Sequence, residues 1–203
     1  MQNPPAETKI ARLQSDPIGE DLIRGLLRAE EPACAALCRR FGPALHGFAA
    51  AQLAGDNELA EEVVIRALAD AARNIGQFNP KKSSLATWLY GIVRRQIQGE
   101  LRKQKRRSSV PPSAQVSLEA AAEIASEDDT SAATISQLEA QRRVAELAAI
   151  LSEAEMEVLN LHYVEEFSLK EIAKIIGRSE GAVESLLHRA KQKARESQPP
   201  AGE

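Results

Sequence analysis

Hydrophobic residues recur at helical spacing along the chain, and this pattern predicts four helices in its first half. They are expected over 18–29, from Pro32 to about residue 53 with a bend at Gly42-Pro43, from about 57 to 75, and from Ser83 or Ser84 to 107. A loop rich in turn-forming residues, 76–84, separates the last two. The positions expected to face inward on the third and fourth helices are Leu59, Val63, Ala67, Ala71, Ile75, Leu85, Trp88, Leu89, Ile92, Val93, Ile97 and Leu101.

Helical spacing returns near residue 134 and continues to about 196. Ser152 followed by Glu155 forms a capping box, so a helix is expected to begin there. We expect Met156, Leu159 and Tyr163 to lie on the buried side of this helix.

A helix-turn-helix is predicted at residues 168–193. Ser168 and Glu171 form a second capping box, Gly177 ends the first helix, and Ser179 can cap the second. The second helix has an apolar side at Val183, Leu186, Leu187, Ala190 and Ala194, while polar residues on its other side can face a DNA groove. Helical hairpins of other proteins share this pattern, so the hairpin alone leaves both interpretations open.

The stretch between the two helical parts has the composition of a linker. It contains Pro111-Pro112, several serines and an acidic cluster, and it cannot bury enough apolar surface to fold independently. The sequence therefore predicts an all-α protein with two small helical domains joined by a flexible acidic linker. The expected divisions are a polar extension 1–17, a first domain 18–107, a linker 108–133, a second domain 134–196 and a tail 197–203. A single fused core enclosing the arginine-rich ridge of the first domain would contradict this organisation.

Charge is segregated along the chain, although its net value is only −3, from 26 basic and 29 acidic residues. Such a balance excludes a protein that coats nucleic acid by bulk electrostatics. Residues 94–107, however, hold seven cations and one anion, and residues 108–139 hold six anions and no cation. We hypothesise that the acidic connector shields the basic surface or takes the place of nucleic acid on it.

Cys34 and Cys38 stand four residues apart, a spacing that fits neither a redox motif nor a zinc framework. We expect them to be small core residues in a reducing compartment. Redox or metal sensing is the alternative, and it requires exposed thiols.

Other function classes receive little support from the sequence. The three histidines, His46, His162 and His188, are far apart, and neither a glycine-rich phosphate loop nor a nucleophile–base motif is present. We therefore expect no catalytic residue, no metal and no cofactor. No apolar run approaches the roughly 18 residues that span a bilayer, and residues 1–15 are polar, so a cytoplasmic protein without membrane insertion is expected.

Two stretches carry a resemblance to a known family. Residues 78–94, in which Trp88-Leu89-Tyr90 runs into arginines, and residues 151–191, which contain the helix-turn-helix, are similar to regions two and four of the extracytoplasmic-function (ECF) sigma factors of bacterial RNA polymerase. The resemblance covers nearly the whole chain. It implies a factor that directs promoter recognition and DNA melting, with core RNA polymerase, duplex and melted promoter DNA, and an anti-sigma protein as partners.

The resemblance also implies three binding sites. The contact with the clamp coiled coil of the polymerase falls on Ala60, Glu61, Glu62, Val63, Ile65 and Arg66. Binding of the minus-ten element falls on Asn79, Lys81, Lys82, Ser83, Trp88, Arg94, Arg95 and Arg102. Binding of the minus-thirty-five element falls on Ser179, Glu180, Gly181, Ala182, Glu184, Ser185, His188, Arg189 and Lys191.

Physical arguments support the two DNA sites without the family. Melted DNA requires cations along its backbone and a pocket for an extruded base, which a polar loop beside a basic helix can supply. Duplex DNA requires a helix whose first residues reach base edges while later cations hold phosphates. Trp88 has a competing explanation, because a single Trp at helical spacing with leucines is more often a core anchor than a stacking platform.

Several positions depart from the family pattern. Ile65 and Arg66 stand where the family has an amide and an acid, and Arg95 and Gly99 align with an Asn and an Asp on the promoter-melting helix. Glu184 and Leu186 stand where the recognition helix usually has Lys and Arg; Glu184 could instead accept a hydrogen bond from cytosine. A second hypothesis therefore remains: a sigma-like decoy or adaptor that binds an anti-sigma protein and has weakened DNA binding.

Overall fold

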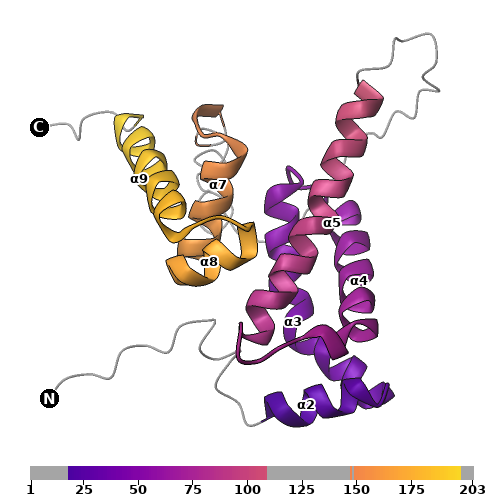
Figure 1. Ribbon diagram of the computed structural model, residues 1–203. Helices are drawn as coiled ribbons and strands as arrows, with labels where there is room; N and C mark the ends of the chain where they lie inside the picture. Colours follow the sequence, from indigo (N-terminus) through magenta and orange to yellow (C-terminus); the bar gives the residue numbers. More distant parts are fainter. Residues whose placement is uncertain (1–17, 109–146, 148, 198–203) are drawn as a thin grey trace, which may run out of the picture.

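The computed structural model describes residues 18–108, 147 and 149–197 (Figure 1). In these ranges the regular secondary structure is entirely helical. The polar extension, all of the predicted linker beyond Ser108 and the start of the second predicted domain lie outside the described residues. The all-α fold class is confirmed.

The N-terminal unit contains the four predicted helices. They are α2 (Ile18–Leu27), α3 (Glu31–Gln52), α4 (Asn57–Arg73) and α5 (Leu85–Ser108), with a short 3-10 turn, η1 (Ile75–Gln77), after α4. The Asp56 carboxylate caps α4 by accepting from the Leu59 amide at 3.0 Å, and the Ser84 hydroxyl accepts from the Thr87 amide at 3.1 Å at the start of α5. Helix α3 continues through Pro43 without ending.

The C-terminal unit contains α7 (Glu153–Leu159), a π-helical turn η3 (Asn160–Val164), α8 (Leu169–Ile176) and α9 (Glu180–Glu196). Both predicted capping boxes are confirmed, at Ser152 with Glu155 and at Ser168 with Glu171. Gly177 adopts a left-handed conformation with φ of 68°, which ends α8 and directs the chain into α9. The helix-turn-helix has formed where the sequence predicted it.

Tyr163 does not face the core, and its expected burial was wrong. Its exposed fraction is 55%, whereas Leu161 is completely buried. The π-helical turn explains the difference, because a wider turn changes which residues of the following segment face inward. The hydrophobic spacing of an ordinary α-helix cannot anticipate this shift.

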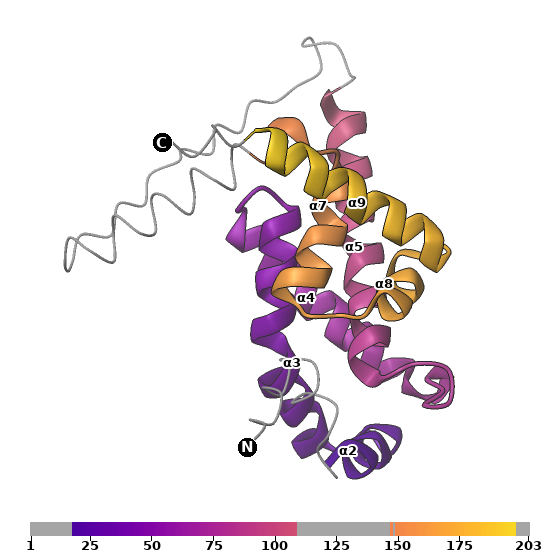
Figure 2. The same cartoon turned by 90° about the vertical axis from the view of Figure 1, so that its left-hand side faces the viewer.

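The two units pack against each other along α5 and α8 (Figures 1 and 2). A single cluster of buried residues includes side chains from both. At its centre the Tyr90 ring lies between Phe48 of α3 and Phe167 of the C-terminal unit, with centroid distances of 5.1 and 4.8 Å. The hydrophobic pattern predicted both units but not this shared core.

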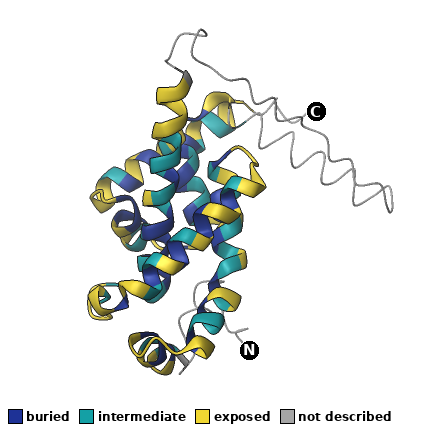
Figure 3. Cartoon of the chain, turned by 90° about the vertical axis from the view of Figure 1, so that its right-hand side faces the viewer, coloured by how far each residue is buried: buried dark blue, intermediate teal, exposed yellow. Residues whose placement is uncertain are grey.

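The arginine-rich ridge, which comprises residues 94–107 of α5, remains largely outside the shared core. Residues 102–107, in the last turns of α5, are exposed and project beyond the bundle (Figure 3). Arg95 is also exposed. The exception is Arg94, whose side chain is only 17% exposed.

Candidate nucleic-acid and polymerase interfaces

The first half of α9 presents an open polar surface. Its inner side is formed by Val183, Leu186, Leu187 and Ala190, all of which are buried. Of the residues predicted to bind the minus-thirty-five element, those that are exposed are Ser179, Glu180, Gly181, Glu184, Ser185, His188 and Arg189, while Ala182 and Lys191 are half-buried. The start of α9 could therefore enter a groove of duplex DNA without a rearrangement of the protein.

Leu186 is one of the departures from the family pattern, and the structure assigns it to the core. Its exposed fraction is 5%. Because the Leu186 side chain packs inside the C-terminal unit, it cannot contact a DNA phosphate. Glu184, in contrast, is exposed on the open surface.

Cations in the second half of α9 are held by neighbouring side chains. The Lys193 ammonium lies 2.8 Å from the Glu155 carboxylate of α7, and the Arg189 guanidinium lies 3.8 Å from it. The hydrogen bond from Lys193, followed by that from the Ser152 backbone amide, lowers the pKa of Glu155 to about 2. Lys191 lies over the exposed Tyr163 ring, 5.3 Å from its centroid.

The loop before α5 carries the first part of the predicted minus-ten site. Asn79, Lys81 and Lys82 are exposed, and Ser83 is half-buried. The Asn79 side-chain oxygen accepts from the Lys81 amide at 2.9 Å, which fixes the turn that presents the two lysines. The loop thus forms an exposed polar surface directly before α5.

Helix α8 covers part of this surface. A cavity of about 470 Å³ lies between α5 and α8, and its α5 side includes Ser83, Trp88, Arg94 and Arg95. Across it, the Lys174 ammonium donates to the Lys82 carbonyl, and the Thr87 hydroxyl donates to the Glu171 carboxylate at 3.4 Å. Five of the eight predicted minus-ten residues, Lys82, Ser83, Trp88, Arg94 and Arg95, therefore border the C-terminal unit in this conformation.

Arg94 is the predicted DNA contact most completely engaged by the protein itself. Its Nε and one terminal nitrogen donate to the two carboxylate oxygens of Glu157, at 2.6 and 3.1 Å. The two side chains are only 17% and 10% exposed. Arg95, the next residue, is exposed and donates to its own helix at the Gly91 carbonyl, 3.2 Å away.

Trp88 is half-buried against Phe78, with ring centroids 5.4 Å apart. This packing supports its interpretation as a core anchor that borders the predicted minus-ten site. One edge of the residue still lines the α5–α8 cavity.

A buried polar contact beside Arg94 escaped prediction. The Tyr90 hydroxyl donates to the Glu165 carboxylate, and both residues are almost completely buried between the units. Burial first, and then the negative charge of Glu165, raises the pKa of Tyr90. Spacing along the sequence gave no signal of the pair, because its members are 75 residues apart and on different units.

A largely apolar groove of about 690 Å³ lies between α3 and α4. Ile65, which is 60% exposed, stands on its α4 side, while Cys34, Cys38 and His46 line its α3 side. The expectation of core cysteines was wrong, since Cys38 is exposed and Cys34 half-buried. Helix α3 has apolar residues on two sides, so hydrophobic spacing could not decide which side is covered.

The predicted polymerase-contact residues divide between this groove and the inside of the unit. Glu61 and Ile65 line the groove, and Glu62 is exposed beside it. Ala60 and Val63 are completely buried, so they support α4 from within. Residues Val64 and Leu68 also line the groove and were absent from the predicted set.

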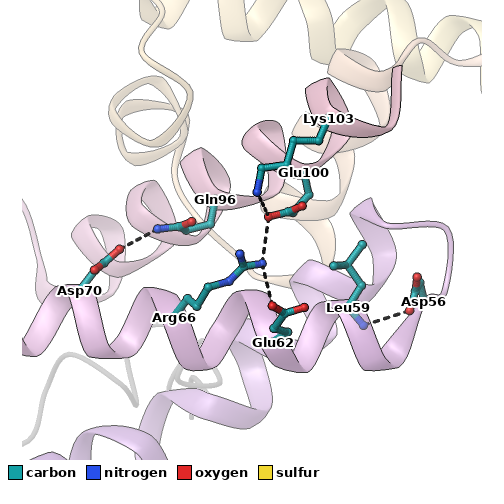
Figure 4. Close-up of polar contacts among 8 residues, drawn as sticks. All are labelled: Asp56, Leu59, Glu62, Arg66, Asp70, Gln96, Glu100 and Lys103. Carbon is teal, nitrogen blue, oxygen red and sulfur yellow. Dashed lines mark hydrogen bonds and ion pairs between the residues drawn. The ribbon is translucent and has the colours of Figure 1, made fainter. Parts of the chain in front are cut away.

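Arg66 ties α4 to α5 (Figure 4). Its guanidinium lies 3.0 Å from the Glu100 carboxylate and 3.8 Å from that of Glu62. Lys103 also contacts Glu100, and these cations lower the pKa of its carboxyl group, with Lys103 as the larger influence. The reversed charge at residue 66 is therefore matched by an acid on the neighbouring helix.

Two further observations concern ligands and membranes. Within the described ranges, no group of three or more His, Cys, Asp or Glu residues could hold a metal ion. Among the helices of those ranges, none combines the length and apolar character that crossing a bilayer requires.

Comparisons with known proteins agree with this architecture. The chain matches the family described as Sigma-70 region 2 over residues 37–107 and the family described as Sigma-70, region 4 over residues 141–193. The structure of the sigma factor RpoE in complex with the anti-sigma factor NepR, from Bartonella quintana, has a TM-score of 0.57 and 25% identity, covering 76% of this chain and 89% of that chain. The structure of CnrH in complex with the cytosolic domain of CnrY has a TM-score of 0.60 and 20% identity, covering 88% and 95% respectively. No curated protein sequence matches.

Two sigma-70 regions in this order, on two helical units of the expected kind, define the class of protein. The chain belongs to the sigma-70 family of bacterial RNA polymerase sigma factors, as an extracytoplasmic-function member.

Proposed function

We propose that this sigma factor docks on core RNA polymerase through the α3–α4 groove, reads the minus-thirty-five element with the first half of α9, and holds the melted minus-ten element on α5 and the loop 79–83. The observation that supports the proposal is the presence of exposed polar surfaces on both units: the loop 79–82 with its lysines in the N-terminal unit, and the first half of α9 in the C-terminal unit. Catalysis forms no part of this function, which we place in the cytoplasm.

The groove supports the docking step because it offers apolar surface that the chain itself leaves uncovered. Val64, Ile65 and Leu68 form its α4 side, and the exposed Ile65 is the most accessible of them. Val64 and Leu68 are already buried, so a helix of the polymerase clamp would mainly bury Ile65, and such burial contributes roughly 25 cal/mol per Å² of apolar area.

A matched pair of substitutions tests this site. Ile65→Asp places a charge in the groove and should weaken binding to purified core polymerase at least tenfold, because a buried unpaired charge is strongly unfavourable. Leu27→Asp is the control, since Leu27 is 58% exposed, close to the value for Ile65, but lies on α2. Equal affinity of both variants for core polymerase would remove the groove from the docking site.

The decoy hypothesis remains the second candidate, and Glu184 is the observation that favours it. This exposed acid lies on the α9 surface proposed to approach DNA, where it would repel phosphates. Run-off transcription with purified core polymerase on a genomic fragment library separates the two functions. Transcripts from a restricted promoter set support the sigma factor. No transcript from any fragment, together with tight binding to an anti-sigma protein, would support the decoy.

We further propose control by an anti-sigma protein. The support is the likeness to the structure of the sigma factor RpoE, which was determined in complex with the anti-sigma factor NepR. Co-purification with a candidate partner, followed by its effect on the run-off assay, tests this step.

A further inference from the structure

Helix α7 carries three alternating acids, and each of them contacts a cation of α5 or α9. The Glu153 carboxylate lies 3.0 Å from Lys105 at the basic end of α5. Glu157 holds Arg94 with two hydrogen bonds. Glu155 lies 2.8 Å from Lys193 on α9. One short helix thus engages cations of both α5 and α9.

The spacing of the acids explains this double engagement. Residues four apart on a helix share a side, whereas residues two apart point in nearly opposite directions. Glu153 and Glu157 therefore face α5, and Glu155 faces α9. Figure 1 shows α7 between these two helices.

The chemistry of the contacts resembles that of a DNA backbone. A carboxylate that accepts two parallel hydrogen bonds from a guanidinium occupies the same donors that a phosphate would use. The edge of Arg94 formed by Nε and one terminal nitrogen cannot hold Glu157 and a phosphate at the same time, because both of these donors face the carboxylate.

We propose that α7 is an internal competitor of DNA: Glu153 and Glu157 occupy cations of α5 while the two units are packed together, and they must leave α5 before the minus-ten strand binds. The inference rests on the proposed function, because it concerns the same DNA surfaces. The apparent affinity for DNA is then the intrinsic affinity reduced by the fraction of molecules in which α7 has left α5.

The test uses the full chain and labelled oligonucleotides of arbitrary sequence, one single-stranded and one duplex. Glu153→Gln with Glu157→Gln should raise affinity for the single strand roughly threefold to tenfold and steepen the salt dependence by about one unit of slope. Glu155 is left unchanged because it completes the capping box of α7. Glu20→Gln, an exposed acid on the distant α2, is the control for the loss of negative charge.

A second measurement follows the separation of the units. Trp88 is the chain's single tryptophan and borders the α5–α8 cavity, so iodide quenching of its emission should increase in the double variant. Circular dichroism checks that helicity is retained. If the double variant loses helicity, the single variant Glu153→Gln tests the proposal instead, because the Glu153–Lys105 ion pair is exposed and its loss should not unfold α7. An increase of about twofold in affinity for the single strand is then expected.

Unchanged affinity and salt slope relative to Glu20→Gln would overturn the proposal, whatever the tryptophan emission shows. Run-off transcription with core polymerase is measured in parallel on the same proteins. Loss of transcripts from every protein, including the unaltered chain, would count against the proposed function but would leave the oligonucleotide comparison decisive for α7.

Discussion

The two proposed DNA surfaces differ in their accessibility. The first half of α9 is exposed and ready to meet a duplex. The α5 surface is bordered by α8, and its best-placed cation, Arg94, is paired with Glu157. The difference indicates an order of events: duplex recognition is compatible with packed units, whereas binding of the melted strand requires them to separate.

Helix α8 produces this asymmetry because it is buried on two sides. Ile172 and Ala173 pack inside the helix-turn-helix, while Ile175 and Ile176 line the cavity against α5. An amphipathic helix usually has a single apolar side. The second side of α8 allows the C-terminal unit to cover the N-terminal one.

The largest expected effect concerns the shared core. Phe167→Ala removes the ring that packs edge-on against Tyr90, and it should lower the free energy of unfolding by about 3–5 kcal/mol. Tyr163→Ala, an exposed aromatic of the same unit, should change it by only about 0.5 kcal/mol. Urea unfolding measures both. Similar losses in the two variants would show that the units do not share a core.

The second-largest expected effect concerns two adjacent residues, Arg94 and Arg95. Arg94→Gln leaves the largely buried Glu157 without its bidentate partner and should cost about 3 kcal/mol of unfolding free energy. Arg95→Gln should cost less than about 0.5 kcal/mol, because that side chain is exposed. If thermal unfolding finds the two variants equally stable, the Arg94–Glu157 pair does not hold the units together.

The sequence predicted local features that depend on neighbouring residues. The capping boxes at Ser152 and Ser168 and the helix stop at Gly177 follow from short-range hydrogen bonding and backbone conformation, and all three are present. Tyr163 was misplaced because a π-helical turn changes the side-chain register. Spacing along one segment is insufficient wherever the helix itself is irregular.

Features that join distant segments could not be predicted in this way. Arg66 was assigned to the polymerase contact, but its partner Glu100 lies on another helix and became visible only in the structure. The Tyr90–Glu165 contact and the role of Glu157 depend on how two units pack. The site residues that remain predictions are those whose partners are other molecules.

Lowering the pH should weaken the contact of α7 with α9. The expected loss of unfolding free energy is smaller than that from Phe167→Ala or Arg94→Gln. Because the folded pKa of Glu155 is lowered to about 2, its stabilising contribution is present above the usual glutamate pKa of 4.5 and is lost as the pH falls toward 2. Lys193→Gln should flatten this part of the pH profile, since Lys193 is the main cause of the shift. Urea unfolding between about pH 5 and pH 3 measures it; a profile unchanged by Lys193→Gln would contradict the assignment.

The smallest expected effect concerns the open surface. Glu184→Lys should strengthen binding to duplex DNA and steepen the salt dependence by about one unit of slope, because an exposed acid on α9 becomes a possible phosphate contact. Glu58→Lys on α4 makes the same charge change at an exposed site away from α9. Equal effects of the two substitutions in a fluorescence anisotropy titration would place α9 outside the groove.

Reversible cross-linking of the two units tests whether they must separate before the melted minus-ten strand can bind. In a Cys34→Ser, Cys38→Ser background, Lys82→Cys and Lys174→Cys would be joined by a short cleavable bismaleimide, across the contact between the loop and α8. We predict that the locked protein gives no run-off transcript with core polymerase and that cleavage of the linker restores transcription to the level of the unlinked variant. Equal transcription from the locked and cleaved proteins would contradict the account, because the minus-ten strand would then be bound without separation of the units.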